Sequence, residues 1–265
     1  MPVNRKQRLL FAGGFGALAA FFLVWAWKFG TANPGAEGLT ASALYTSMAA
    51  LCLAAAGALC RRQSVTDALG LEAGRISWIQ LGVVALGTVG LSHLCGELLR
   101  ETALWDQGIL QRLEETLSGL GIPEMAFAAV GFVLAPAIGE ELLFRGLLLR
   151  GLLPRLGPTL AIVISSMLFG ALHVDPGQAL ATTVLGIYLG LLAFLSGSTR
   201  GPIFCHLVNN GVALASIGMA NPAPGTQESS PEGWTLAFAA VATAAGTWTL
   251  VQMRRTATER DELPG

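Results

Sequence analysis

The chain has 265 residues, of which 53% are hydrophobic and 12% are charged, about half the ~25% of charged residues usual in soluble domains. This composition supplies too little polar surface to cover a soluble fold of this size, and the net charge of -1 offers no electrostatic footprint for DNA or RNA. It therefore excludes an ordinary soluble enzyme, a disordered chain and a nucleic-acid-binding protein. A polytopic membrane protein embedded in a lipid bilayer is the expected class.

Apolar stretches long enough to cross a bilayer recur along the whole chain. A transmembrane helix needs about 20 mostly apolar residues, because it rises ~1.5 Å per residue across a hydrocarbon core ~30 Å thick. The stretches show no period-two alternation, so they predict helices rather than the strands of a barrel. We expect an all-α fold with about eight transmembrane helices, at 9–28, 39–60, 77–96, 124–150, 159–175, 177–196, 201–220 and 234–253.

The first span follows a short basic segment, Asn4-Arg5-Lys6-Gln7-Arg8. Such a segment is typical of the n-region of a cleaved signal peptide, which is one interpretation. The apolar run that follows approaches 20 residues, however, and lacks a convincing small-residue cleavage site. These features favour an uncleaved first transmembrane helix.

Basic residues predict the orientation of the bundle. If all eight spans are real, Lys28, Arg100 and Arg112 are the basic residues that fall on the far side, and the rest of the 16 fall on the side of the N-terminus. The positive-inside rule then places both termini in the cytoplasm. Because arginine largely replaces lysine and alanine and glycine are abundant, we expect a bacterial protein of the cytoplasmic (inner) membrane.

The chain divides into three expected parts. Residues 1–123 contain three spans and an amphipathic segment, residues 124–220 form a helical core, and residues 221–265 contain a connector, the last span and a cytoplasmic tail. Within the first part, 97–123 carries apolar residues among charges at helical spacing, which predicts an amphipathic helix at the membrane interface or, alternatively, a solvated loop helix. The connector is expected at 221–233, where Pro and Gly recur.

Three spans carry polar side chains within the hydrocarbon core, where burying a charge costs free energy. An ionisable group near the bilayer centre costs at least ~2.5–3.5 kcal/mol, and most spans avoid that cost. Each exception contains residues four apart, which share one helix face. Their concentration in an otherwise charge-poor bundle indicates a functional site. The three groups are Glu140-Glu141 with Arg145, Phe169 with His173, and His206 with Asn210.

Spacing predicts how the first two groups meet. Glu141 and Arg145 are one turn apart in the order that favours a helical ion pair, which leaves Glu140 as the unpaired carboxylate. Counted along two antiparallel helices joined by 154–158, Glu140 and His173 lie ~21 Å and ~22 Å from the connection, at one depth. His206 lies only ~9 Å along its helix from Arg200, so the same arithmetic does not place the third group.

A carboxylate and an imidazole that share a water can perform hydrolysis. Glu140 would take the proton of the water and His173 would orient it, while His206 and Asn210 would donate hydrogen bonds to the developing oxyanion. No serine or cysteine stands in a recognisable nucleophile motif. No HExxH motif is present, so no cofactor is expected, although zinc held by Glu140, His173 and His206 is the alternative.

Several other side chains have simpler interpretations. Phe169 is expected to pack rather than react, and His93 to form a helix–helix hydrogen bond. The cysteines, which show no CxxC spacing, are expected to be small core residues. They are Cys52, Cys60, Cys95 and Cys205.

With the motifs EExxxR, FxxxH and HxxxN in this order, the sequence resembles the CPBP family of intramembrane proteases, which contains the CAAX prenyl endopeptidase Rce1 and the bacterial Abi proteins. The resemblance covers roughly residues 124–215. It implies an eight-helix endopeptidase that cuts near the C-terminus of its substrate by a metal-independent glutamate mechanism. In that mechanism Glu140 and His173 activate water, His206 and Asn210 form the oxyanion hole, and Glu141, Arg145 and Phe169 support them.

The expected substrate is a membrane-tethered protein or peptide. Many bacterial members of the family act on unprenylated substrates, including precursors with C-terminal sorting signals in a myxosortase-like branch, so the resemblance leaves the substrate open. Two alternatives to an endopeptidase stand. One is a proton-coupled transporter, because intramembrane carboxylates and histidines also build proton relays, although no inverted repeat is visible. The other is a non-catalytic membrane scaffold or immunity protein that retains the motifs.

Overall fold

Helices make up the regular structure of the computed structural model, which describes residues 5–33, 35–61, 63–106, 109–173, 175–219 and 233–259. No strand occurs in these ranges, and two of the helical segments, η1 and η2, are π-helical. The elements are α1 (Arg5–Ala32), α2 (Ala36–Cys60), α3 (Val65–Leu69), α4 (Trp78–Arg100), α5 (Ala103–Asp106), α6 (Ile109–Leu117), α7 (Ile122–Ala129), η1 (Val130–Leu134), α8 (Ala135–Glu141), η2 (Leu142–Leu149), α9 (Arg150–Ala171), α10 (Pro176–Ser196), α11 (Arg200–Met219) and α12 (Gly233–Glu259).

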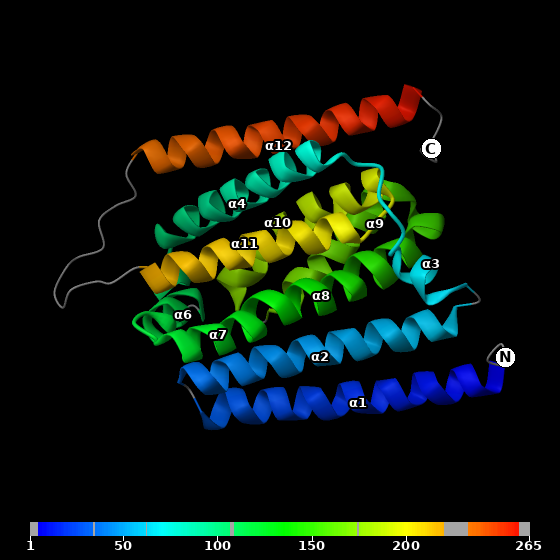
Figure 1. Cartoon of the computed structure of the whole chain (residues 1–265), viewed down its shortest axis with the longest axis horizontal. Helices are drawn as coiled ribbons and strands as arrows, with labels where there is room; N and C mark the ends of the chain where they lie inside the picture. The colour runs from blue at the N-terminus through cyan, green and yellow to red at the C-terminus, as the bar shows by residue number, and fades with distance from the viewer. Residues whose placement is uncertain are drawn as a thin grey trace.

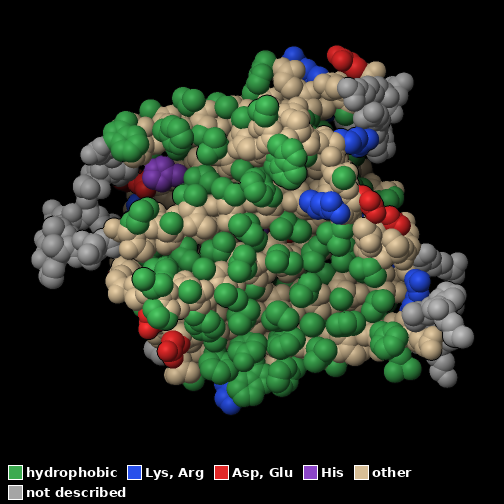
Figure 2. Space-filling model, in the orientation of Figure 1, with side chains coloured by type: hydrophobic (Ala, Val, Ile, Leu, Met, Phe, Trp, Pro, Cys, Tyr) green, Lys and Arg blue, Asp and Glu red, His purple; other side chains and the backbone are tan. Residues whose placement is uncertain are grey.

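Seven helical runs in the described ranges are long and apolar enough to cross a membrane. Apolar side chains cover much of the face seen in Figure 2, and large residues such as Trp27 and Trp78 are 72% and 84% exposed. A soluble monomer rarely exposes apolar surface on this scale, whereas lipid accommodates it. The chain is an all-α polytopic membrane protein, as predicted.

The expected fourth and fifth spans are the two arms of one 50-residue helical run, Ile122–Ala171. The run reverses at Gly157, which has φ 71° and ψ 170° and lies between Pro154 and Pro158. Only glycine adopts this backbone region readily. The second arm returns along η2, where the Ser165 hydroxyl donates to the Phe144 carbonyl oxygen at 3.0 Å. One glycine therefore converts a long apolar run into a hairpin.

The bundle is layered. Helices α1 and α2 pack together at one edge, α4 and α12 pack together at the other, and α8, α10 and α11 lie between them (Figure 1). Helices α4 and α12 approach closely because of glycine: a Cβ on Gly90 would lie 2.5 Å from the Ala239 carbonyl oxygen. The start of α1 and the end of α12 lie at the same end of the bundle (Figure 1).

Segment 97–123 is not one amphipathic helix. Helix α4 continues to Arg100, the short helices α5 and α6 follow, and α7 begins at Ile122. Arg100 holds this arrangement by pairing with Glu97 at 3.4 Å and with Glu114 of α6 at 2.6 Å. The apolar side of α6 packs into the protein through Leu117, in a cluster with η1 and α11. The predicted connector 221–233 lies outside the described residues except for Gly233.

Two residues of the connection between α10 and α11 are buried in the protein. Ser198 and Thr199 are 2% and 1% exposed. Thr199 donates to the Leu69 carbonyl oxygen at 2.7 Å, and Ser198 donates to the Glu72 carbonyl oxygen at 2.7 Å. The start of α11 is therefore anchored to the end of α3 and to the segment that follows it.

Candidate active site

The three motifs contribute side chains from neighbouring helices. Glu140 and Glu141 end α8, and Arg145 follows one turn later in η2. Phe169 lies in the last turn of α9, with His173 just beyond it, and His206 and Asn210 lie on α11. The Gly157 hairpin brings the first two groups together, as the Phe144 and Phe169 rings, 5.2 Å apart, demonstrate. Direct contacts join the third group to the first.

Glu141 is the centre of a buried ion network. Its Oε1 accepts hydrogen bonds from Arg145 Nη1 at 2.8 Å and from His206 Nδ1 at 2.9 Å. The side chains of Glu141 and Arg145 are 0% and 1% exposed. Because a carboxylate only accepts hydrogen bonds, this contact places a proton on Nδ1 of His206 and leaves its Nε2 for the site. The predicted Glu141–Arg145 pair is present in this geometry.

Arg145 is held on two further sides. Its Nη2 donates to the Gly186 carbonyl oxygen of α10 at 3.0 Å, and its guanidinium carbon lies 4.4 Å from the centre of the Phe169 ring. Such a cation–π contact contributes about 2 kcal/mol when it is desolvated. No sequence pattern points to Gly186, because its contribution is a backbone carbonyl that any residue type carries.

Phe169 is the aromatic spacer of the site. Its ring packs edge-on against the rings of His173, 5.2 Å away, and His206, 6.1 Å away. It therefore separates the two imidazoles while also covering Arg145. Packing was the role expected of it, and here it packs against the polar residues themselves.

Glu140 differs from its neighbour. It is 7% exposed, and no protein group in the described part of the chain donates a hydrogen bond to its carboxylate. His173 and His206 interact with it electrostatically, and so do Glu141 and Arg145. A buried, unpaired carboxylate that interacts with two imidazoles can hold and deprotonate a water molecule.

The remaining nitrogen of each histidine is available for chemistry. His173 Nδ1 lies 3.1 Å from the Phe169 carbonyl oxygen, to which it must donate, so that Nε2 carries the free lone pair in the neutral ring. Asn210 is anchored differently: its Nδ2 donates to the Phe132 carbonyl oxygen of η1 at 2.9 Å. One N–H of that amide remains, one helical turn from His206.

No group of three or more His, Cys, Asp or Glu side chains in the described residues is arranged to hold a metal ion. The donors that could serve are the Glu140 carboxylate and the Nε2 atoms of His173 and His206, since both Nδ1 atoms are engaged. A pocket of about 170 Å³ reaches Arg145 from the end of the bundle where Arg150, Ser198 and Thr199 lie.

Comparisons with known proteins agree with this arrangement. Residues 122–212 match the family described as "Type II CAAX prenyl endopeptidase Rce1-like". The central segment is Rce1-like. The chain is also 30% identical over 141 residues to the "Putative membrane peptidase YdiL" of Bacillus subtilis (strain 168), across 46% of this chain and 55% of that protein. No solved structure matches the chain.

The Rce1-like segment contains all seven motif residues, from Glu140 to Asn210. It begins at α7 and ends within α11, so α1 to α6 and α12 lie outside it. The chain spans about half the length of the Bacillus relative. The similarity to the Rce1-like family therefore covers the hairpin and the helices that carry the candidate site.

Proposed function

We propose that this protein is an intramembrane endopeptidase that hydrolyses a peptide bond near the C-terminus of a membrane-tethered protein substrate. The observation that carries the proposal is the buried, unpaired Glu140 carboxylate, which interacts electrostatically with His173 and His206 and precedes the buried Glu141–Arg145 pair. The Rce1-like match and the peptidase name of the Bacillus relative support the same reaction class. A scaffold would not need a buried carboxylate without a hydrogen-bond partner in this position.

In the proposed reaction Glu140 is the general base. As the water oxygen attacks the scissile carbonyl carbon, one water proton passes to the Glu140 carboxylate, while His173 Nε2 accepts a hydrogen bond that orients the water. When the C–N bond breaks, Glu140 returns the proton to the leaving nitrogen. No metal takes part in this scheme.

His206 and Asn210 would stabilise the oxyanion. Because the Nδ1–H of His206 donates a hydrogen bond to Glu141, a second hydrogen bond donated from Nε2 requires the imidazolium form. Two carboxylates, Glu140 and Glu141, then face two cations, Arg145 and His206, so the buried charges balance. The free N–H of Asn210 would supply the second donor.

Orientation follows from the basic residues. The start of α1 and the end of α12 share one end of the bundle, and the positive-inside rule assigns that end to the cytoplasm. We propose the inner membrane of a bacterium as the location. A substrate already tethered to that membrane would meet the site at a fixed depth, and its cleaved segment must be extended because a helix buries its amides in hydrogen bonds.

The test uses substitutions of three residues and one matched control. Glu140→Gln, His173→Ala and His206→Ala should each abolish cleavage while the protein still accumulates in the membrane. His93→Ala on α4 is the control, because it removes the remaining histidine of the chain and touches no motif residue. Cleavage that survives all three substitutions would overturn the proposal.

The substrate is found by comparing C-terminal peptides of membrane proteins from the gene-deletion strain and its parent by mass spectrometry. Retained C-terminal tails on a small set of proteins in the deletion strain, removed again by wild type but not by Glu140→Gln, would identify the substrate class. Unchanged C-termini would refute the substrate proposal. Stoichiometric zinc that is lost together with activity in His173→Ala would refute the metal-free mechanism.

A further inference from the structure

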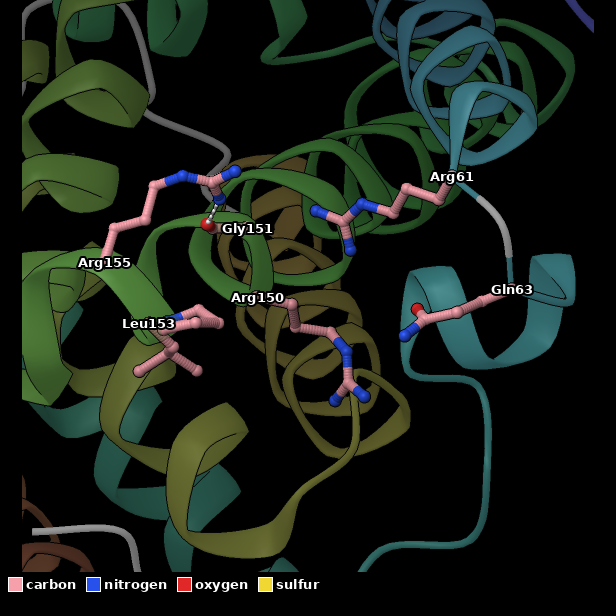
Figure 3. Close-up of a pocket in the computed structure, with 7 residues that line it drawn as sticks. Arg61, Gln63, Arg150, Gly151, Leu153 and Arg155 are labelled. Carbon is pink, nitrogen blue, oxygen red and sulfur yellow. Dashed lines mark hydrogen bonds between the residues drawn. The ribbon is translucent and has the colours of Figure 1, made fainter.

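A pocket away from the motif residues lies at the end of the bundle where α2 ends and α9 begins. Its volume is about 550 Å³, within the range of small-molecule sites. Three arginines, Arg61, Arg150 and Arg155, dominate its polar lining, and we call it the arginine pocket. Figure 3 shows the guanidinium groups of Arg61 and Arg155 extending toward each other from separate helices.

Backbone contacts hold all three arginines in place. Arg61 donates to the carbonyl oxygens of Ala68 and Leu147. Arg155 donates to the Gly151 carbonyl oxygen at 2.7 Å, and a Cβ on Gly151 would lie 2.7 Å from Arg61 Nη2. This lack of a side chain lets two cations gather at one point.

Arg150 completes the lining from the other side. It donates to the Gly197 carbonyl oxygen at 3.2 Å, and a Cβ on Gly70 would lie 2.9 Å from its Nη1. Gly70 and Gly197 both have positive φ, 64° and 70°. The turn at Gly70 therefore makes room for this guanidinium, and the turn at Gly197 presents a carbonyl oxygen to it.

Among the described residues, no carboxylate lies within ion-pair distance of these three guanidinium groups. Their hydrogen-bond partners are neutral carbonyl oxygens. Burial, together with the charges of Arg150 and Arg155, lowers the pKa of Arg61. Cations that repel one another across a preformed cavity are typical of an anion site without its anion.

We propose that the arginine pocket binds a phosphate group. Guanidinium forks match phosphate oxygens in bidentate geometry, which a single point charge does not. The pocket also has apolar walls, Leu153 and Pro154, and Leu156 beside them is 38% exposed. A phosphate carried by a lipid headgroup would satisfy both surfaces, since basic pockets between helix ends are suited to anionic headgroups. Free phosphate has the same charge chemistry.

The test uses the purified full-length protein and two phosphate sources. Native mass spectrometry from mixed micelles measures retained phosphatidylglycerol against phosphatidylcholine, and thermal unfolding measures stabilisation by added inorganic phosphate. Arg155→Gln and Arg150→Gln should each weaken phosphate-dependent binding about fivefold. Arg254→Gln is the matched control, because it removes one exposed arginine from the same end of the bundle, outside the pocket.

Each result decides the proposal. A lipid headgroup is supported if the protein retains phosphatidylglycerol selectively, if both pocket variants weaken this retention, and if the control variant does not. The same pattern with inorganic phosphate, without lipid selectivity, would support a soluble phosphate ligand. The proposal is overturned if neither source binds preferentially, if the pocket variants bind like wild type, or if Arg254→Gln weakens binding equally.

Discussion

The same substitution at two adjacent glutamates should impair two different properties, stability at Glu141 and catalysis at Glu140. Glu141 accepts hydrogen bonds from Arg145 and His206, whereas Glu140 accepts none from described protein groups. Replacing Glu141 with glutamine should therefore destabilise the fold, and replacing Glu140 with glutamine should abolish catalysis without lowering stability. Comparing the stabilities of the two variants tests the structural role of each glutamate without knowledge of the substrate.

The magnitude follows from burial. With Glu141 and Arg145 at 0% and 1% exposure, removing one partner leaves an uncompensated buried cation, which costs about 3–5 kcal/mol. One kcal/mol corresponds to about 2–4 °C in Tm for chains of 150–250 residues. Glu141→Gln should then lower Tm by about 6 °C or more. Glu140→Gln should leave Tm within about 2 °C of wild type and reduce cleavage at least about 100-fold.

Thermal unfolding of detergent-purified variants, followed by tryptophan fluorescence, measures the first effect, and cleavage of a C-terminally tagged substrate measures the second. Glu97→Gln, which disturbs the partly exposed pair with Arg100, is the control for loss of a carboxylate outside the site. A Glu141→Gln protein as stable as wild type would refute the buried network. A Glu140→Gln protein as unstable as Glu141→Gln would refute the distinction between the two glutamates.

Three further predictions follow from single contacts. Gly139→Ala should lower stability by about 1–3 kcal/mol, because the new Cβ would lie 2.5 Å from the Ser47 carbonyl oxygen of α2. Gly82→Ala is the control: its Cβ would meet nothing within 4 Å, so Tm should stay unchanged or rise slightly. Equal effects of the two substitutions would contradict the close contact between α8 and α2. Asn210→Ala should reduce kcat about 10²–10³-fold with a smaller change in KM, and an unchanged kcat would remove Asn210 from the oxyanion hole. Asp175→Ala removes the N-cap of α10 and the acceptor for the first backbone amide of α6. It should lower the free energy of unfolding by about 1–2 kcal/mol and speed hydrogen exchange in α6. Unaltered exchange would refute the role of Asp175 in holding α6.

Much of the architecture was predictable because lipid imposes a simple length rule. Apolar stretches of about 20 residues predicted the helices, and their bounds differ from the structure by only a few residues at most ends, as at 201–220 against Arg200–Met219. The i, i+4 spacing of Glu141 and Arg145 also predicted their pair. Periodicity and local spacing carry this information directly, so one sequence suffices to extract it.

Contacts between distant segments were not predictable in the same way. The position of His206 beside Glu141 did not follow from counting along its helix, because it depends on the contact of α11 with the end of α8. Likewise, 97–123 was expected as an amphipathic helix, either at the membrane interface or in a solvated loop, whereas it forms several short helices that the ion pair of Arg100 with Glu114 holds together. Both features depend on partners far away in the sequence that local patterns do not encode.

The reversal at Gly157 has a consequence for how this chain can change length. One residue inserted into a helical arm rotates everything beyond it by about 100° and shifts it by ~1.5 Å. An insertion between Arg145 and the turn, or between the turn and His173, would therefore swing one imidazole away from Glu140. Residues added at the turn itself would lengthen the loop without changing the register of either arm. Insertions and deletions should thus be tolerated at the turn and should abolish activity in the arms. The site requires two fixed helix lengths, because these lengths keep Glu140 and His173 level with each other.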